Sequence, residues 1–212
     1  IAEQHSVSFA AGLACEGMKP VVAIYSTFLQ RAYDQLIHDV ALQDLDVLFA
    51  LDRAGLVGLD GATHQGAFDL SFVRCIPNMM IMAPSNEDMA WKMLNTGFDH
   101  VGPVAIRYPR GSGMGISYEK TDDKIEIGKS CTIIESDKKE VIILSFGSLL
   151  QSAVEASKKF DARVVDMRFI KPLDQTLIEE ISNEYNLIVT LEDNVVAGGA
   201  GAAINEKLAS LN

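Results

Sequence analysis

Val21-Val22-Ala23-Ile24-Tyr25-Ser26 decides how the first half of this chain folds, because a short apolar run leads directly into a helical pattern. Ser26 can cap a helix, and the apolar residues after it recur at intervals of three and four. These residues are Leu29, Ala32, Tyr33, Leu36, Ile37, Val40 and Ala41. A second apolar run, Val47 to Leu51, predicts another buried strand. Strand, helix and strand in this order indicate a parallel βαβ unit.

The same alternation continues along the 212 residues. Further strands are predicted at 79–83, 104–107, 141–145, 162–166 and 187–191, and further helices at 85–97, 149–160, 174–185 and after Gly198 to Gly201. Ser85 and Asp88 are spaced like a capping box at the start of the first of these helices. We therefore predict an α/β fold with two doubly wound, mainly parallel sheets. A polar, glycine-containing stretch divides the chain into a first domain at 1–113, a linker at 114–126 and a second domain at 127–212.

The composition argues against several classes of protein. With 29 acidic and 18 basic residues, the net charge of −11 repels phosphates and argues against a nucleic-acid partner. No apolar run of about 18 residues occurs, so no membrane span is predicted. The three cysteines show no CxxC spacing, which favours free thiols in a reducing compartment over disulfides or zinc. His5 and His38 also lack partners at metal-ligand spacing, and no metal site is predicted within this chain.

Polar side chains follow three of the predicted strands. Tyr25 follows the first, Asp52 and Arg53 the second, and Tyr108 and Arg110 the strand at 104–107. Because ligands of parallel sheets bind outside the carboxyl ends of the strands, we expect these groups at one edge. Two arginines there suggest an anion such as a phosphate or carboxylate. The alternative is that both arginines pair with Asp52 and other acids of this acidic protein.

Three further polar residues are candidates for a functional site. Asp60 and His64 lie in a glycine-rich loop at 52–66, although His64 can equally be a solvated loop residue. Glu3 lies at the head of a helical run, Ser6 to Glu16, that otherwise looks buried. A buried carboxylate is costly unless a hydrogen-bonded partner compensates it, so Glu3 is expected to have a specific role.

Several blocks of the chain together resemble the 1-deoxy-D-xylulose-5-phosphate synthase family. They are Ile1-Ala2-Glu3-Gln4-His5, Tyr25 to Gln35, Asp52-Arg53-Ala54-Gly55, Thr63 to Asp69, Arg107-Tyr108-Pro109-Arg110-Gly111, Val165 to Asp174 and Gly198-Gly199-Ala200-Gly201. Transketolase and the β subunit of 2-oxoacid dehydrogenase E1 components share the glutamate and the doubly wound units, but the blocks at 25–35 and 63–69 favour the synthase. A non-enzymatic α/β binding module is the third alternative.

The resemblance implies a pyrimidine-binding domain of the thiamine-diphosphate-binding fold, followed by a transketolase C-terminal domain. It implies a transferase that condenses pyruvate with D-glyceraldehyde 3-phosphate, releases carbon dioxide and makes 1-deoxy-D-xylulose 5-phosphate for isoprenoid (terpenoid), thiamine and pyridoxal biosynthesis. The implied cofactors are thiamine diphosphate and Mg²⁺, whose diphosphate and metal ligands would lie in a further N-terminal domain. A cytoplasmic homodimer is also implied. We expect these 212 residues to be a fragment, truncated at both ends and inactive alone.

The resemblance also implies roles at the cofactor. Glu3 would hydrogen-bond the pyrimidine ring nitrogen and favour the imino tautomer, so that the cofactor's own exocyclic nitrogen acts as the base. Phe28 would stack on the pyrimidine ring, and Arg31 would approach the same ring.

At the acceptor substrate, the resemblance implies a phosphate site and two catalytic groups. Arg53 and Arg110 would clamp the phosphate, and Tyr25 would add a hydroxyl. Asp60 and His64 would face the hydroxyl and the carbonyl of the acceptor.

Overall fold

The computed structural model of the protein describes residues 2–211. Its strands are β1 (Val21–Tyr25), β2 (Leu48–Asp52), β3 (Met80–Met82), β4 (Val104–Arg107), β5 (Cys131–Ile134), β6 (Val141–Ser145), β7 (Arg163–Asp166), β8 (Phe169–Lys171) and β9 (Leu187–Leu191). Its α-helices are α1 (Glu3–Cys15), α2 (Ser26–Leu29), α3 (Tyr33–Gln35), α4 (Asp69–Arg74), α5 (Glu87–Asp99), α6 (Leu150–Phe160), α7 (Gln175–Glu184) and α8 (Ala200–Ala209). The 3₁₀- and π-helical segments are η1 (Gln30–Ala32), η2 (Leu36–Ala41), η3 (Gly58–Asp60), η4 (Ala62–His64) and η5 (Gly147–Leu149).

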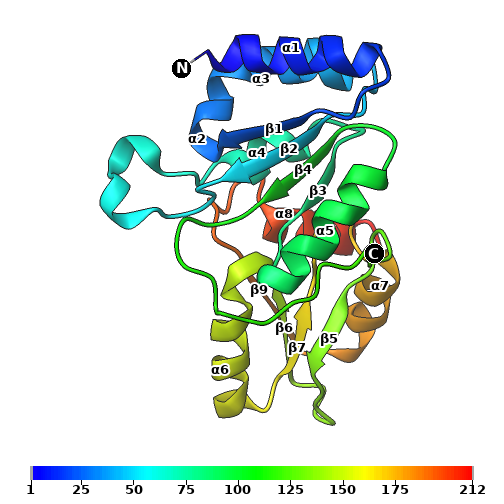
Figure 1. The fold of residues 1–212 in the computed structure, drawn as a ribbon. Coiled ribbons are helices and arrows are strands. Elements are labelled where there is room, and N and C mark those ends of the chain that lie inside the picture. The colour runs from blue at the N-terminus through cyan, green and yellow to red at the C-terminus, as the bar shows by residue number, and fades with distance from the viewer. Residues whose placement is uncertain (1, 212) are drawn as a thin grey trace.

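The strands form a five-stranded sheet in the order β1-β2-β4-β3-β8 and a four-stranded sheet in the order β5-β7-β6-β9. In Figure 1 the first sheet lies in the upper half of the molecule and the second in the lower half. All neighbouring strands are parallel except the pairs β3–β8 and β5–β7. The predicted α/β fold with two mainly parallel sheets is therefore confirmed.

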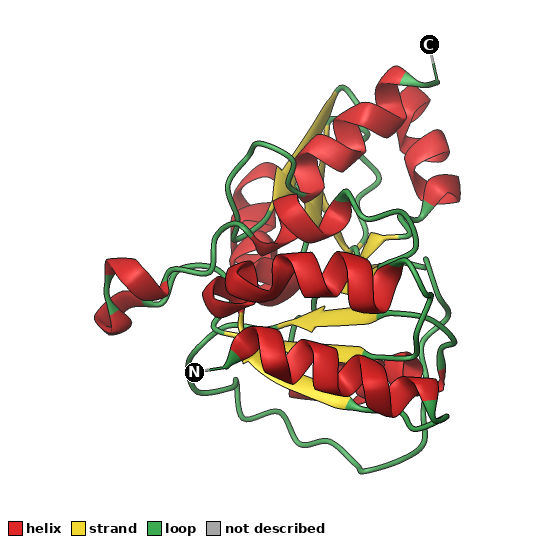
Figure 2. Cartoon of the chain, turned by 90° about the horizontal axis from the view of Figure 1, so that it is seen from above, coloured by secondary structure: helices red, strands yellow, loops and turns green. Residues whose placement is uncertain are grey.

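Helices cover both faces of the first sheet (Figure 2). Phe49 and Leu51 of β2 belong to a core that includes residues of α1 and η2. Leu48 and Ala50 of the same strand belong to a second core with Met93 of α5. Because successive side chains of a strand point to opposite faces, this near-continuous apolar run is needed to fill both layers.

The segment after Ser26 differs from the single helix that its periodicity predicts. It is divided into α2, the 3₁₀ turn η1, α3 and the π-helical η2. The predicted apolar stripe is nevertheless inside the protein, where Leu29, Ala32, Leu36 and Val40 have no exposed surface. Burial thus follows the sequence pattern, while the hydrogen-bond register changes along the segment.

The start of α5 corrects a second prediction. The cap is Asn86, whose Oδ1 accepts a hydrogen bond from the backbone N–H of Met89 at 2.9 Å. The Ser85 hydroxyl instead donates to Oδ2 of Asp166 at 2.7 Å, across the junction between the two halves of the chain. Asp88 pairs with Lys92 one turn along α5. Ser and Asn are both favourable N-cap residues. Because the Ser85 hydroxyl is bound to Asp166, Asn86 caps the helix.

Two strands were not predicted. β5 pairs with β7, and β8 leaves the second half of the chain to pair with β3 of the first sheet. One hydrophobic core also spans both halves, because Ile81 of β3 and Leu144 of β6 belong to the same cluster. Within residues 2–211, no helix has both the length and the apolar character needed to cross a membrane.

Candidate active site

The carboxyl ends of β1, β2 and β4 meet at one edge of the first sheet. Tyr25 is paired in register with Asp52, and Leu51 with Arg107. The loop between Gly55 and Gly66 projects from this edge (Figures 1 and 2). The expected edge therefore exists, and the polar residues after the three strands share it.

Asp60 joins the two candidate arginines. Its Oδ2 accepts from Nε of Arg53 at 2.9 Å and lies 2.8 Å from Nε of Arg110. Arg53 also pairs with Asp52 through a terminal guanidinium nitrogen. Pairing with acids, the alternative reading of the sequence, is thus observed. It does not use up the guanidinium groups, since each has five N–H donors.

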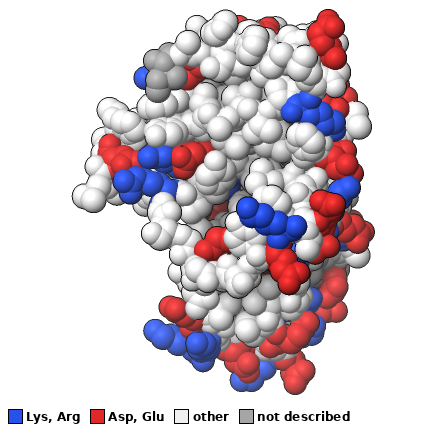
Figure 3. All heavy atoms as spheres, viewed as in Figure 1, with Lys and Arg blue, Asp and Glu red and all other residues white. Residues whose placement is uncertain are grey.

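Basic and acidic atoms are accordingly intermixed at the base of the projecting loop (Figure 3). An open cleft of about 500 Å³ lies beside them, lined by Asp52, Arg53 and residues 108–112. Arg53 and Arg110 keep 22% and 42% of their side chains exposed, so solutes can reach both. The arrangement can bind an anion in this cleft.

A row of aromatic and cationic groups runs from the arginine pair towards α1. The Arg53 guanidinium lies 3.9 Å from the centre of the Tyr25 ring, and Tyr25 stacks on Phe28 at 5.0 Å. Arg31 lies 5.0 Å from the Phe28 ring centre, and His64 contacts the same ring edge-on at 5.4 Å. His64 is therefore packed against this row and is not simply a solvated loop residue.

Glu3 ends this row. Its side chain is 3% exposed, and Oε1 accepts from the Arg31 guanidinium at 2.7 Å. The pKa of Glu3 is lowered, first by its own backbone N–H and also by Arg31, although burial opposes the shift. The carboxylate therefore stays ionised near neutral pH and can accept a hydrogen bond from a ligand.

The projecting loop is held by close backbone contacts. Gly55 and Gly66 exchange two backbone hydrogen bonds of 2.7 and 2.8 Å. A Cβ atom on Gly66 would lie 2.1 Å from the carbonyl oxygen of Arg53, so only glycine fits there. Asp193, from the loop after β9, accepts at 3.3 Å from the backbone N–H of Leu56. The second half of the chain thus supports the loop that carries Asp60 and His64.

A buried ion pair lies under the same edge and was missed as part of the site. Arg107 donates to both carboxylate oxygens of Asp69, at 2.8 and 3.1 Å, and to the backbone carbonyl of Asp193 at 2.9 Å. The signal available in the sequence was a charged residue at the end of the apolar strand β4. A buried arginine requires such a partner.

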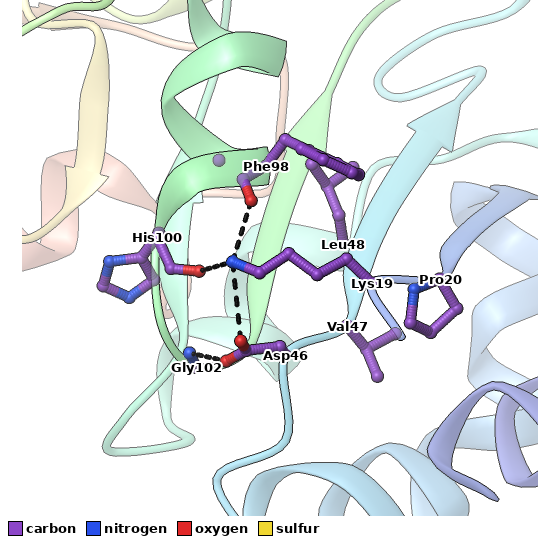
Figure 4. Close-up of a pocket in the computed structure, with 9 residues that line it drawn as sticks. Lys19, Pro20, Asp46, Val47, Leu48, Phe98, His100 and Gly102 are labelled. Atoms are coloured by element: carbon purple, nitrogen blue, oxygen red, sulfur yellow. Dashed lines mark hydrogen bonds and ion pairs between the residues drawn. The ribbon is translucent and has the colours of Figure 1, made fainter. Parts of the chain in front are cut away.

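At the opposite end of the strands, a small pocket is largely filled by protein groups. Around the small pocket of Figure 4, Nζ of Lys19 binds the carbonyl oxygens of Phe98 and His100, each at 2.9 Å, and lies 3.4 Å from Asp46. The remaining space is only about 10 Å³, about enough for one water molecule. Among residues 2–211, no three His, Cys, Asp or Glu side chains are grouped as metal ligands would be.

Family models match the two halves of the chain. The transketolase pyrimidine binding domain matches residues 1–114, and the transketolase C-terminal domain matches residues 131–212. A solved split-gene transketolase, described as an inactive β4 tetramer, is 32% identical to this chain and superposes with a TM-score of 0.88. The match covers 99% of this chain and 68% of the transketolase chain. A transketolase from Campylobacter jejuni has a TM-score of 0.68 over 97% of this chain and 37% of its own, but at 16% identity it indicates the fold alone.

Curated relatives are more similar in sequence. Proteins named 1-deoxy-D-xylulose-5-phosphate synthase from Idiomarina loihiensis and Vibrio parahaemolyticus are 60% and 61% identical over 209 and 206 residues. These matches cover 99% and 97% of this chain but 33% of each relative. The chain thus spans about a third of the length of the curated relatives it matches.

Proposed function

The chain belongs to the transketolase family by its pyrimidine-binding and C-terminal domains, and from this premise we propose that it is part of a 1-deoxy-D-xylulose-5-phosphate synthase. The reaction is the condensation of pyruvate with D-glyceraldehyde 3-phosphate, with release of carbon dioxide. The similarity to proteins of that name supports the reaction. The observation that carries the proposal is the unbroken row of contacts from Glu3 to Arg110, which links a buried acid to a pair of arginines.

The end of the row at Glu3 fits the aminopyrimidine ring of thiamine diphosphate. When bound, this cofactor supplies a carbon nucleophile that also accepts the electrons released by decarboxylation. An ionised, buried carboxylate can hold a proton at the pyrimidine ring nitrogen, and the flat Phe28 ring can stack on the heterocycle. The Arg31 side chain is 62% exposed and can move from the Phe28 face to admit the ring.

The other end of the row fits a phosphorylated acceptor. Asp60 holds Nε of both Arg53 and Arg110, and Asp52 holds a terminal nitrogen of Arg53. Each guanidinium group still has further N–H donors for phosphate oxygens. Tyr25 underlies Arg53 and adds a hydroxyl. Asp60 and His64 then face the hydroxyl and carbonyl of the acceptor, as the resemblance implies. The open cleft beside Arg53 and Arg110 leaves room for the phosphate.

Four further features belong to the same proposal and rest on the resemblance. They are a bound Mg²⁺ ion, a homodimer, a cytoplasmic location and a product that serves isoprenoid, thiamine and pyridoxal synthesis. Because the chain spans about a third of its relatives, we also propose that these residues do not turn over substrate by themselves. Synthase activity of the purified 212-residue chain without added protein would overturn that point.

Replacement of Glu3 in the full-length protein tests the function. We expect Glu3→Gln to lower turnover of pyruvate and D-glyceraldehyde 3-phosphate by about 10² to 10⁴, the usual range for an acid–base contribution, with the melting temperature retained. Glu16→Gln is the matched control, because Glu16 lies exposed at the other end of α1. Turnover of Glu3→Gln within about threefold of wild type would contradict the proposed role. Transfer from a ketose phosphate, or acylation of lipoamide, in place of this condensation would identify a transketolase or an E1 component.

A further inference from the structure

One face of α5 is occupied by the chain that follows Arg110. Glu87, Trp91, Asn95 and Asp99 lie at every fourth position of this helix, and each binds the stretch at 113–124. Glu87 accepts from the backbone N–H of Gly115 at 2.7 Å. The Trp91 and Asn95 side chains both donate to the carbonyl of Thr121 at 2.8 Å, and Asp99 pairs with Lys124 at 2.6 Å. We call residues 111–124 the strap.

The first part of the strap lies on the protein surface and also contacts the Trp91 ring, whose centre is 6.2 Å from the Tyr118 ring and 6.0 Å from Nζ of Lys120. Residues 111–120 are exposed and form no helix or strand. The stretch at 108–112 lines the open cleft beside Arg53 and also a second cleft of about 370 Å³ between α5 and Ser148. Two open clefts thus flank the backbone at Arg110. On its N-terminal side Tyr108 is fixed by backbone hydrogen bonds with Leu51 and Ala54, each of 3.0 Å, so the side that lacks a packed layer is the one that leads into the strap.

Glu87 is the contact nearest to Arg110. A Cβ atom on Gly113 would lie 2.0 Å from its Oε1, so the strap passes directly against the carboxylate. The pKa of Glu87 is lowered, first by its own backbone N–H and then by the N–H of Gly115, with smaller effects from Met114 and Ile116. The ionised side chain thus lies among several amide groups of the strap.

We propose that Glu87 is a positioning residue, which fixes the strap and thereby holds Arg110 where it meets the phosphate of the acceptor substrate. The inference rests on the proposed function, because it assigns the anion at Arg110 to that acceptor. Asp60 holds only the end of the Arg110 side chain, which is 42% exposed, and exposed ion pairs are weak. The backbone contact at Glu87 supplies the second point that orients the guanidinium group.

The test compares two acceptors in the full-length enzyme. With Glu87→Ala we expect the KM for D-glyceraldehyde 3-phosphate to rise about tenfold, less than the ~10²-fold cost of a 1 Å misplacement, with little change in kcat or in the KM for pyruvate. The kcat/KM for unphosphorylated D-glyceraldehyde should stay at the wild-type value, since that substrate does not use Arg110. Glu87→Gln keeps an acceptor oxygen and should recover most of the affinity.

Two further variants guard against a merely structural effect. Asp88→Ala is the matched control, because Asp88 lies in the same first turn of α5 but pairs with Lys92. It should leave both acceptors unchanged. Gly113→Ala keeps Glu87 in the sequence but displaces its carboxylate from the strap. It should therefore reproduce the selective rise in the KM for D-glyceraldehyde 3-phosphate.

The outcomes separate the inference from the function it rests on. If the wild-type enzyme does not condense pyruvate with D-glyceraldehyde 3-phosphate, the proposed function fails. If it does, but Glu87→Ala and Gly113→Ala leave the KM unchanged or weaken both acceptors equally, the positioning role of Glu87 is wrong.

Discussion

Two groups of charges lie at the same edge of the first sheet and differ in solvent access. Arg53 and Arg110 share Asp60 and are 22% and 42% exposed. Arg107 and Asp69 pair a few residues away and are 5% and 1% exposed. The residue types are the same, but only the first pair can exchange protein partners for a ligand. Exposure thus separates a candidate binding group from one that holds the two halves together.

Breaking the buried pair should give the largest effect on stability. Arg107→Met leaves the Asp69 carboxylate buried without its partner, which should lower the free energy of unfolding by about 3–5 kcal/mol. Urea denaturation of the full-length enzyme measures the change. Arg110→Met is the control and should cost no more than about 1 kcal/mol. Equal losses from the two variants would remove the distinction between the pairs.

The exposed pair should respond in activity instead. Arg53→Ala removes charge-assisted hydrogen bonds to the phosphate, each worth about 1.5–3 kcal/mol, and should raise the KM for D-glyceraldehyde 3-phosphate about 10- to 150-fold. Arg74→Ala is a matched control, since Arg74 makes a similar two-point pair with Glu206 away from the edge. If the KM of Arg53→Ala for D-glyceraldehyde 3-phosphate equals that of Arg74→Ala, Arg53 does not bind the acceptor.

The hydrogen-bonded pair of Ser85 and Asp166 extends the comparison to pH dependence. Burial raises the pKa of Asp166, although Ser85 and the backbone N–H of Arg168 oppose the shift. When the pKa of a carboxyl is higher in the folded than in the unfolded state, the free energy of unfolding of the protein falls as pH rises. The fall begins at the unfolded pKa, about 3.9, and ends above the folded pKa. Asp166→Asn should remove this part of the pH dependence. Near pH 7 the variant should have a free energy of unfolding that is higher by about 1.4 kcal/mol for each unit by which the Asp166 pKa is raised.

Urea titrations of wild type and Asp166→Asn at a series of pH values between about 4 and 7 measure the difference. The two curves should converge at the acidic end. Parallel curves across the range would mean that Asp166 is not held with a raised pKa.

Much of the site could be predicted because its signals are local. The apolar runs at 21–25, 47–51 and 104–107 gave the strands, and the rule on carboxyl ends then gathered Tyr25, Arg53 and Arg110. The loop contacts could not be predicted in this way. Nothing in the sequence near Leu56 indicates that Asp193, 137 residues away, binds its backbone.

The sequence by itself determined the α/β layers, the buried stripe after Ser26 and the edge at which polar groups collect. Each follows from periodicity or from spacing along a few neighbouring residues. Only the tertiary structure decided that β8 joins the first sheet, that Asn86 replaces Ser85 as the cap and that Arg107 is buried while Arg110 is open. These outcomes depend on which remote segments come into contact in the folded chain, because Arg107 and Asp69 are 38 positions apart and Ser85 and Asp166 are 81 positions apart.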